Sequence, residues 1–170
     1  LDPPGQAIIF CNTKRVVDEC TEALLSNGFP ADRLHGDMTQ PMRERVLRKF
    51  RDGQISLLVA TDVAGRGLDI DGVELVINYD LPRDAEDYVH RIGRTGRAGR
   101  SGKAVSLVAQ RERRLLKMVE RYARTTIPRL EVPSRKLLQT KRAEQLIENV
   151  REQVENDATT GHAAGTEALD

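Results

Sequence analysis

A short segment rich in arginine and glycine combines residue types and spacing that could bind phosphate. It reads His90-Arg91-Ile92-Gly93-Arg94-Thr95-Gly96-Arg97 and falls at the end of an expected helix. Guanidinium groups match phosphate oxygens in a two-point contact, and an arginine brought to a γ-phosphate neutralises charge during phosphoryl transfer. The alternative is a basic patch for any polyanion, and the residues alone favour neither interpretation.

A second segment, residues 59–70, runs from a buried strand into a loop. Ligands of open α/β sheets bind beyond the carboxyl ends of the strands, where Thr61 and Asp69 would lie. A threonine hydroxyl can donate to a phosphate, and a carboxylate can accept from ribose hydroxyls. The alternative is a turn whose glycines serve backbone geometry and whose Asp62 is a cap, and the segment taken alone favours that alternative.

A third segment, residues 33–43, carries two groups that suit a nucleic-acid backbone. The amide of Gly36 and the guanidinium of Arg43 could both bind phosphate oxygens. The alternative is that Arg43 is an ordinary exposed charge on a helix.

Two common nucleotide-binding signatures are absent from the sequence. A phosphate loop of the G-x-x-x-x-G-K-[ST] type would need glycine at Arg97 and a hydroxyl residue at Ala104, around Gly102-Lys103. The dinucleotide pattern fails because Gly65-Arg66-Gly67 is followed three residues later by Ile70. The sequence therefore predicts no independent nucleotide-binding loop.

Strand-like and helix-like segments alternate along the chain, which predicts an α/β fold with a parallel sheet flanked by helices. Strands are expected at residues 7–11, 33–35, 55–60, 75–79 and 104–108. Thr13 should cap a helix that ends at Asn27-Gly28, and Pro41 suits the first turn of the next, which Asp52-Gly53 should stop. Asp84 should cap a short helix, and a further helix is expected over residues 111–124.

Length and composition narrow the class of protein. The 170 residues, 39% apolar and 31% charged, fit one globular domain and exclude disordered or fibrous chains. No apolar run approaches membrane-spanning length and no signal peptide is visible, which predicts no membrane association and a cytoplasmic location. Cys11 and Cys20 form no CxxC pair, so we expect small buried residues in a reducing compartment and no metal site.

The net charge of +1 hides a strong asymmetry along the chain. Residues 1–151 carry a net charge of +6, whereas residues 152–170 hold five acids and neither lysine nor arginine. Residues 90–114 hold eight lysines and arginines against one acid and are interleaved with glycines. This segment favours a polyanionic partner, although charge runs are more often solvated faces.

The chain beyond residue 125 has a different pattern. Pro128 and Pro133 predict an extended connector. The apolar stripe of the helix expected after it consists of Ala143, Leu146, Ile147, Val150 and Val154. The stripe must be buried on this domain or on a partner, and the sequence leaves both open. We therefore expect a domain over residues 1–125, an extension over 126–154 and a disordered tail over 155–170.

Taken together, these segments resemble the C-terminal RecA-like domain of DEAD-box ATP-dependent RNA helicases. Motif IV is similar to residues 8–13, motif IVa to Gln40-Pro41-Met42-Arg43, motif V to residues 60–69 and motif VI to residues 90–97. His35-Gly36-Asp37 and Tyr79-Asp80-Leu81-Pro82 also match this group, whereas Gly65 departs from its more usual alanine. The resemblance covers residues 6–108 and implies a RecA-like parallel sheet, here followed by a C-terminal helical extension.

The resemblance implies roles for individual residues. Residues expected to act in ATP hydrolysis are Arg94, Arg97 and His90. Residues expected at the nucleotide are Gly67, Asp69, Arg66, Arg94 and Arg97. Of these, Arg94 and Arg97 would reach the γ-phosphate, and His90 and Arg66 would link the cleft to the partner domain. Residues expected to hold the RNA backbone are Thr61, Gly36, Arg43, Gln40, Asn12, Thr13 and Arg15.

The resemblance also implies partners. ATP with Mg²⁺ would be held mainly by an N-terminal RecA-like domain whose signatures are absent here, so the chain looks like a fragment that is inactive alone. ATP and RNA would close the two domains, and the bent RNA backbone would open a short duplex. The segment after residue 133 is similar to the extension of the bacterial cold-shock DEAD-box type, which can lead into a dimerisation module.

Two other functions stay open. One is a non-catalytic RNA-binding or docking module on the same fold, and the other is a DNA-directed helicase domain of the same superfamily. Arg94, Arg97 and Asp69 favour the RNA helicase, because a pure RNA binder needs none of the three.

Overall fold

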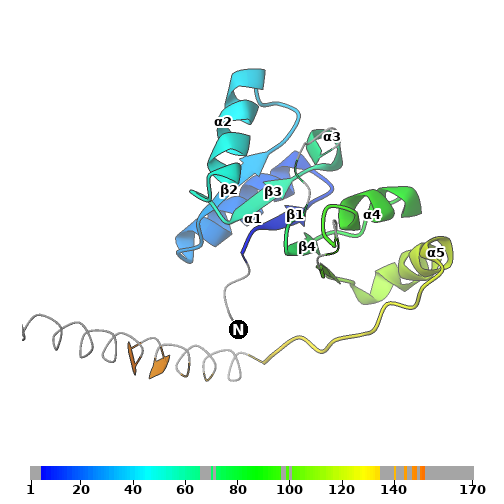
Figure 1. Ribbon diagram of the computed structural model, residues 1–170. Coiled ribbons are helices and arrows are strands. Elements are labelled where there is room, and N and C mark those ends of the chain that lie inside the picture. Colours follow the sequence, from blue (N-terminus) through cyan, green and yellow to red (C-terminus); the bar gives the residue numbers. More distant parts are fainter. Residues whose placement is uncertain are drawn as a thin grey trace, which may run out of the picture. The chain divides into compact units, whose positions relative to one another are not determined.

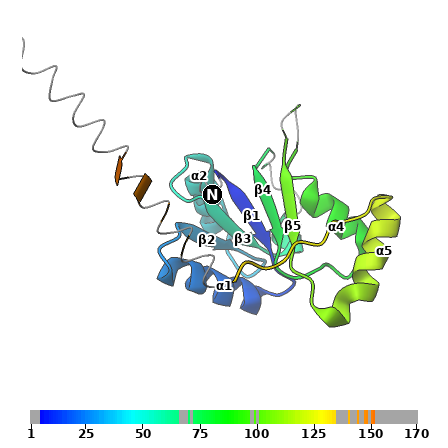
Figure 2. The same cartoon turned by 90° about the horizontal axis from the view of Figure 1, so that it is seen from below.

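The computed structural model describes residues 5–65, 70, 72–96, 99, 101–134, 140, 144, 147, 148, 150 and 151. Its strands are β1 (Ala7–Phe10), β2 (Ala31–Leu34), β3 (Leu57–Ala60), β4 (Leu75–Asn78) and β5 (Lys103–Ser106). They form one sheet in the order β2-β3-β1-β4-β5, and every neighbouring pair is parallel (Figures 1 and 2). The predicted parallel sheet is thus confirmed.

The helices are α1 (Lys14–Ser26), α2 (Gln40–Arg51), α3 (Asp62–Gly65), α4 (Ala85–Ile92) and α5 (Arg113–Ala123), with a 3-10 turn at Gln110–Glu112. The predicted caps of α1 and α4 are confirmed. Thr13 Oγ1 accepts from the Val16 N–H at 3.3 Å, and Asp84 Oδ1 accepts from the Glu86 N–H at 2.8 Å. The one-turn helix α3 lies where the sequence predicted only a loop.

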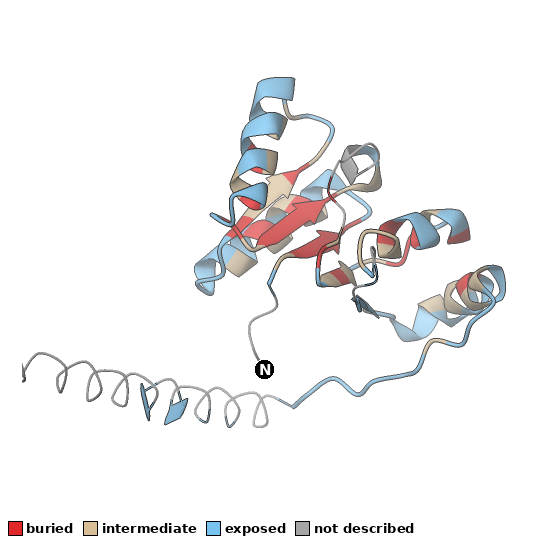
Figure 3. Cartoon of the chain, in the orientation of Figure 1, coloured by how far each residue is buried: buried red, intermediate tan, exposed pale blue. Residues whose placement is uncertain are grey.

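The two faces of the sheet bury different residues of the same strands. Ile8 and Phe10 of β1 pack in one cluster with Phe50 of α2, whereas Ile9 packs in another with Val17 of α1. Figures 1 and 2 accordingly show α1 and α2 on opposite faces of the sheet. Figure 3 shows β1 and β3 buried along their length. Because both faces of the sheet are covered, these two strands are unbroken apolar runs rather than alternating ones.

The edge strand β2 is held by ion pairs in addition to its buried apolar residues Ala31 and Leu34. Asp32 lies 3.0 Å from Lys49 Nζ of α2, and Arg33 Nη1 donates to Asp18 of α1 at 2.7 Å. Successive residues of a strand point to opposite faces, so each charge meets the helix on its own side. Because these charged residues interrupt the apolar pattern of a strand, the sequence did not reveal where β2 begins. The strand starts two residues before the predicted range of 33–35.

Residues 3–127 form one compact unit, and residues 1–2 and 128–170 form another. In the first unit, α4 and α5 pack together around Leu81, Tyr88 and Val119. In the second, residues 140, 144, 147, 148, 150 and 151 are helical, as predicted. The predicted disordered tail, residues 155–170, lies outside the described residues. Among the residues described, no helix combines the length and apolar character that a bilayer span requires.

Cys11 and Cys20 are both free thiols. Cys11 is buried between the sheet and α1, and Cys20 of α1 packs partly buried against the same cluster. A hydrogen bond with Cys20, together with burial, raises the pKa of the Cys11 thiol. The predicted packing role is therefore confirmed for Cys11, while Cys20 is only half-buried.

Candidate nucleic-acid interface at the strand ends

Polar residues from distant parts of the chain meet at the carboxyl ends of β1, β3 and β4. The last residues of these three neighbouring strands lie in register with one another. Asn12, Thr61 and Asp80, which follow them, therefore lie along one edge of the sheet. This is the edge at which open parallel sheets bind ligands.

Arg91 of α4 is buried at this edge, with 2% of its surface exposed. Its Nε and Nη2 donate to the two carboxylate oxygens of Asp62 at 2.5 and 2.6 Å. Its Nη1 donates to the Asp80 carbonyl at 2.7 Å, and its carbon Cζ lies 5.3 Å above the centre of the Phe10 ring. A buried charge is tolerated only when it is paired and hydrogen-bonded, and this one is both.

Asn12 joins the same network rather than pointing away from it. Its Oδ1 accepts from Arg91 Nη2 at 2.9 Å, and its Nδ2 donates to the Leu81 carbonyl at 2.9 Å. Its backbone N–H donates to Asp80 Oδ2 at 2.9 Å. The structure thus gives Asn12 a positioning role, joining the end of β1 to the segment after β4.

Thr61 lies between β3 and the first residue of α3. Its backbone N–H donates to the Leu34 carbonyl at 3.2 Å, which fixes it beside the end of β2. Its side chain is half-buried, and its hydroxyl forms no hydrogen bond with another described residue. The hydroxyl is therefore available to a ligand at this edge.

Two longer helices begin on either side of Thr61. α1 follows β1, α2 follows β2, and β3 lies between these two strands. Free N–H groups and the helix dipole make the start of a helix favourable for an anion. The predicted RNA contacts Thr13 and Arg15 lie at the start of α1, and Gln40 and Arg43 at the start of α2.

The helix-borne side chains also make local contacts. Thr13 caps α1, and Arg15 Nη1 lies 3.2 Å from Glu19. Gln40 Nε2 donates to Glu44 at 3.0 Å. The Arg15 and Gln40 contacts are exposed and weak, so they leave both side chains able to exchange partners.

The loop that carries Gly36 is held to α1 by an ion pair and a second polar contact. Lys14 Nζ lies 2.5 Å from Asp37 Oδ2, and His35 Nε2 lies 3.5 Å from Asp18 Oδ1. The Lys14 ammonium lowers the pKa of Asp37, and Asp37 raises the pKa of Lys14. Apart from its two chain neighbours, no described residue has an atom within 4 Å of a Cβ placed on Gly36, so the anchored loop leaves open space beside its backbone.

The segment after α4 is fixed to the start of β4. The Arg94 carbonyl accepts from the N–H groups of Gly72 at 2.9 Å and Val73 at 3.2 Å. Thr95 and Val73 also pair as an isolated parallel β-bridge. A Cβ on Gly102 would lie 2.1 Å from Thr95 Oγ1, so the close approach before β5 requires glycine. This packing fixes the backbone of Arg94 beyond the end of α4.

His90 and Arg91 are neighbours on α4 with opposite environments. His90 is exposed, with Nε2 3.9 Å from Glu86 Oε1, whereas Arg91 is buried. His90, predicted to act in ATP hydrolysis and to link the cleft to the partner domain, thus lies on the outer side of the helix whose inner side closes the strand-end network. Arg66, Gly67, Asp69 and Arg97, predicted at the nucleotide, lie outside the described residues.

Sequence reasoning missed the residues that hold the site together. Arg91 was counted only as part of a basic segment, and Asp62 was considered only as a cap. One signal was present: Arg91 lies six residues after Ala85 and three after Tyr88, on the buried side of α4. Asn78, a polar residue inside an apolar strand, was a second signal, because Arg91 Nη1 lies 3.2 Å from its Oδ1.

Comparisons with known proteins agree on one family. Residues 1–99 match the model of the helicase conserved C-terminal domain. The chain is 51% identical over 150 residues to the ATP-dependent RNA helicase DeaD of Klebsiella pneumoniae, covering 88% of this chain and 23% of that protein. It therefore spans about a quarter of the length of such curated relatives.

Solved structures show the same fold. The C-terminal domain of the DEAD-box protein Dbp5 superposes with a TM-score of 0.68 at 39% identity, covering 72% of each chain. A DEAD-box protein from Methanococcus jannaschii gives a TM-score of 0.71 at 45% identity, covering 75% of this chain and 35% of that one. The chain therefore belongs to the helicase conserved C-terminal domain family and is a RecA-like C-terminal domain of the DEAD-box type.

Proposed function

We propose that this chain is the second half of an ATP-dependent RNA helicase, which holds RNA and supplies arginines to ATP bound on an N-terminal RecA-like domain. One observation carries the proposal. Arg91 joins the strand ends next to the expected RNA contacts to the helix that leads into Arg94 and Arg97. RNA and nucleotide would thus act on a single rigid unit.

On the RNA side, Thr61, Gly36 and Arg43 would bind the sugar-phosphate backbone between the starts of α1 and α2. Asn12, Thr13, Arg15 and Gln40 would frame the same path. Contacts to the backbone carry little sequence information, so we expect weak base preference. We also expect affinity to fall steeply with salt, since cations are released from RNA on binding.

On the nucleotide side, Arg94 and Arg97 would bind and orient the γ-phosphate, and Gly67 and Asp69 would lie near the phosphate and ribose. His90 and Arg66 would face the N-terminal domain. ATP supplies the free energy of phosphoryl transfer to water when it is bound, and we assign its Mg²⁺ to the N-terminal domain. An arginine of this kind contributes a factor of about 10³ to 10⁵ only where another domain already binds the nucleotide.

The helix of the extension would bind the same helix of a second copy of the chain. Ile147 and Val150 lie on its helix with 54% and 49% of their surfaces exposed. Together with Ala143, Leu146 and Val154 they continue one apolar stripe in the sequence. An apolar stripe of this kind gains free energy by packing against its own copy, so we assign a dimer contact to it.

RNA-stimulated ATP turnover tests the proposed function. We expect no turnover from the chain alone and turnover after fusion to an N-terminal RecA-like domain that carries a phosphate loop. In the fusion, Arg97→Ala should lower kcat by about 10³-fold or more. Arg51→Ala, an exposed arginine at the end of α2, is the matched control and should leave kcat unchanged.

The alternatives give different results in the same assay. Turnover that is indifferent to Arg97, or no turnover in the fusion, would leave an RNA-binding module without a catalytic role. Competition between RNA and DNA of matched sequence tests the DNA-directed alternative, because the 2′-hydroxyl is what a reader of the backbone can distinguish.

A further inference from the structure

The exposed side of α5 carries a row of cations that the strand-end site does not use. Leu115, Leu116 and Val119 pack toward α4. The cations on the opposite side are Arg113, Arg114, Lys117 and Arg121, which we term the α5 basic face. Lys117 follows Arg114 by three residues and Arg113 by four, and Arg121 follows Lys117 by four, which places the four cations on one side of the helix.

Among the described residues, no acidic side chain forms an ion pair with the α5 basic face. The acid within α5 is Glu120, and its Oε1 accepts the Ile127 N–H at 2.9 Å, which ties it to the turn after the helix. Within the described part of the chain, none of the four cations forms an ion pair. Like charges at this spacing destabilise a helix. The row of cations therefore lowers the stability of α5, and no ion pair among the described residues offsets this loss.

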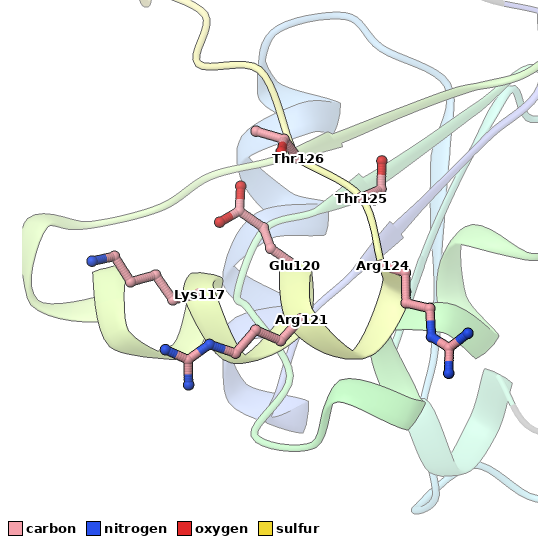
Figure 4. A pocket seen from close by; sticks show the side chains of 6 residues that line it. All are labelled: Lys117, Glu120, Arg121, Arg124, Thr125 and Thr126. Atoms are coloured by element: carbon pink, nitrogen blue, oxygen red, sulfur yellow. The ribbon is translucent and has the colours of Figure 1, made fainter.

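A shallow hollow of about 590 Å³ lies beside the carboxyl half of this face. The residues that line it are Lys117, Glu120, Arg121, Arg124, Thr125 and Thr126. Figure 4 shows Lys117 and Arg121 extending from the same side of α5, with the two threonines on the turn above Glu120. Ammonium, guanidinium and hydroxyl groups all donate hydrogen bonds, so the rim of this hollow is suited to an anion.

Next to the cations lie two exposed side chains that do not carry charge. Met118 is 42% exposed and Tyr122 is 55% exposed. They stand four residues apart on α5, so the basic row is flanked by an apolar row that ends in an aromatic ring. Proteins that bind single strands combine these two elements: cations for the backbone and an aromatic side chain for base stacking.

We propose that the α5 basic face is a second RNA contact of this domain, in which Lys117 and Arg121 bind phosphates and a base stacks on Tyr122. α4 packs between α5 and the strand-end network, so this contact is distinct from Thr61, Gly36 and Arg43. The choice of RNA rests on the proposed function. The aromatic ring beside the cations favours a nucleic acid over an acidic peptide, which would need charge alone.

Fluorescence anisotropy with a fluorescein-labelled 25-nucleotide single-stranded RNA tests the basic row. Each phosphate contact to a single strand contributes about 0.7 to the slope of log affinity against log salt. We expect Lys117→Gln with Arg121→Gln to lower this slope by about 1.4 between 50 and 200 mM salt. Arg48→Gln with Arg51→Gln, which removes two exposed charges from α2, should leave the slope unchanged. Equal losses in both double variants would overturn the proposal.

Binding at Tyr122 can be measured separately by fluorescence, because the chain contains no tryptophan and an indole introduced at this position would be the only one. Tyr122→Ala should weaken binding about five-fold or more without changing the salt slope, whereas Tyr122→Phe should keep the affinity. Tyr122→Trp introduces a single indole, whose fluorescence RNA should quench and polyglutamate should not. Quenching by both polymers would show a general polyanion surface, and quenching by neither would show no contact at Tyr122. Either result overturns the proposal.

A third pair of variants separates this inference from the proposed function. Thr61→Val with Arg43→Gln should weaken binding of a 10-nucleotide RNA, while the α5 variants should affect only the 25-nucleotide RNA. If the strand-end variants have no effect but the α5 variants do, the proposed site fails and the α5 contact stands. If the reverse holds, the α5 contact fails alone.

Discussion

Arg91 and Asp62 form a two-point ion pair inside the domain, although 29 residues of sequence separate them. Asp62 begins α3 one residue beyond the end of β3, after Thr61, and Arg91 lies in the last turn of α4. The pair therefore joins the strand end beside Thr61 to the helix that leads into Arg94. Through Asn12 it also holds the end of β1.

Removing the guanidinium should destabilise the domain strongly. Arg91→Met leaves Asp62 without its partner, and breaking a buried pair costs roughly 3–5 kcal/mol. Urea unfolding followed by circular dichroism measures the change. The exposed pair of Arg15 and Glu19 is the matched comparison, and Glu19→Gln should change stability by less than about 0.5 kcal/mol.

A double-mutant cycle separates pairing from packing. If the loss in Arg91→Met comes from the unpaired carboxylate, adding Asp62→Asn should recover part of it. Additive losses in the double variant would show that Arg91 stabilises through Phe10 and the carbonyl of Asp80 instead. Arg91→Lys should also destabilise, because an ammonium cannot occupy both carboxylate oxygens as a guanidinium does.

The ion pair of Lys14 and Asp37 should respond to pH in a defined direction. Lys14 lowers the pKa of Asp37 below its usual 3.8, so the pairing is fully present above that value and is lost as pH falls through the lowered pKa. Lys14 has its pKa raised above 10.5, so the same pairing is full below 10.5 and is lost as pH rises through the raised pKa. The NMR chemical shift of the Asp37 carboxyl carbon, followed as pH falls, measures the loss of the pairing at acid pH.

Lys14→Gln supplies the control for this titration. Without the ammonium, the pKa of Asp37 should return toward 3.8. The unpaired Asp37 should also free the Gly36 loop, which hydrogen exchange at residues 36–38 would detect. An Asp37 titration curve that Lys14→Gln leaves unchanged would contradict the pairing.

Substitution by alanine should lower the stability of the fold at Gly102 but not at Gly36. Gly102→Ala places a Cβ 2.1 Å from Thr95 Oγ1 and 2.3 Å from Gly96 N, so it should destabilise the fold by about 1–3 kcal/mol. The Cβ of Gly36→Ala meets no atom of the described residues within 4 Å beyond its chain neighbours, so this variant should leave the unfolding midpoint unchanged. A loss of RNA affinity in Gly36→Ala would then report contact with RNA directly. A lowered midpoint in that variant would show that the loop is structural instead.

The dimer contact assigned to the extension predicts a change in mass. Ile147→Asp with Val150→Asp places two charges on the apolar stripe, and sedimentation equilibrium should then shift from dimer to monomer. Glu144→Gln, on the same helix, should leave the mass unchanged. A monomer in the unmodified chain would contradict the assignment.

The arrangement of strands and helices could be predicted because its signals are local. The caps at Thr13 and Asp84, the proline at position 41 and the short apolar runs each act within one turn or one strand. The order of motifs also pointed to the family, which the comparisons confirm. Signals of this kind need no knowledge of what lies across the fold.

The sequence by itself thus determined the α/β class, the five strands and four longer helices to within about two residues at each strand end, and the segments that reach the strand ends. Only the tertiary structure decided that Arg91 is buried, that Asp62 is its ion-pair partner and that Asn12 accepts a hydrogen bond from it. The side-chain partners of Arg91 are Asn12, Asp62 and Asn78, which lie 79, 29 and 13 residues away from it in the sequence. A charge becomes buried when packing removes water from it, and packing joins residues whose separation no local pattern encodes.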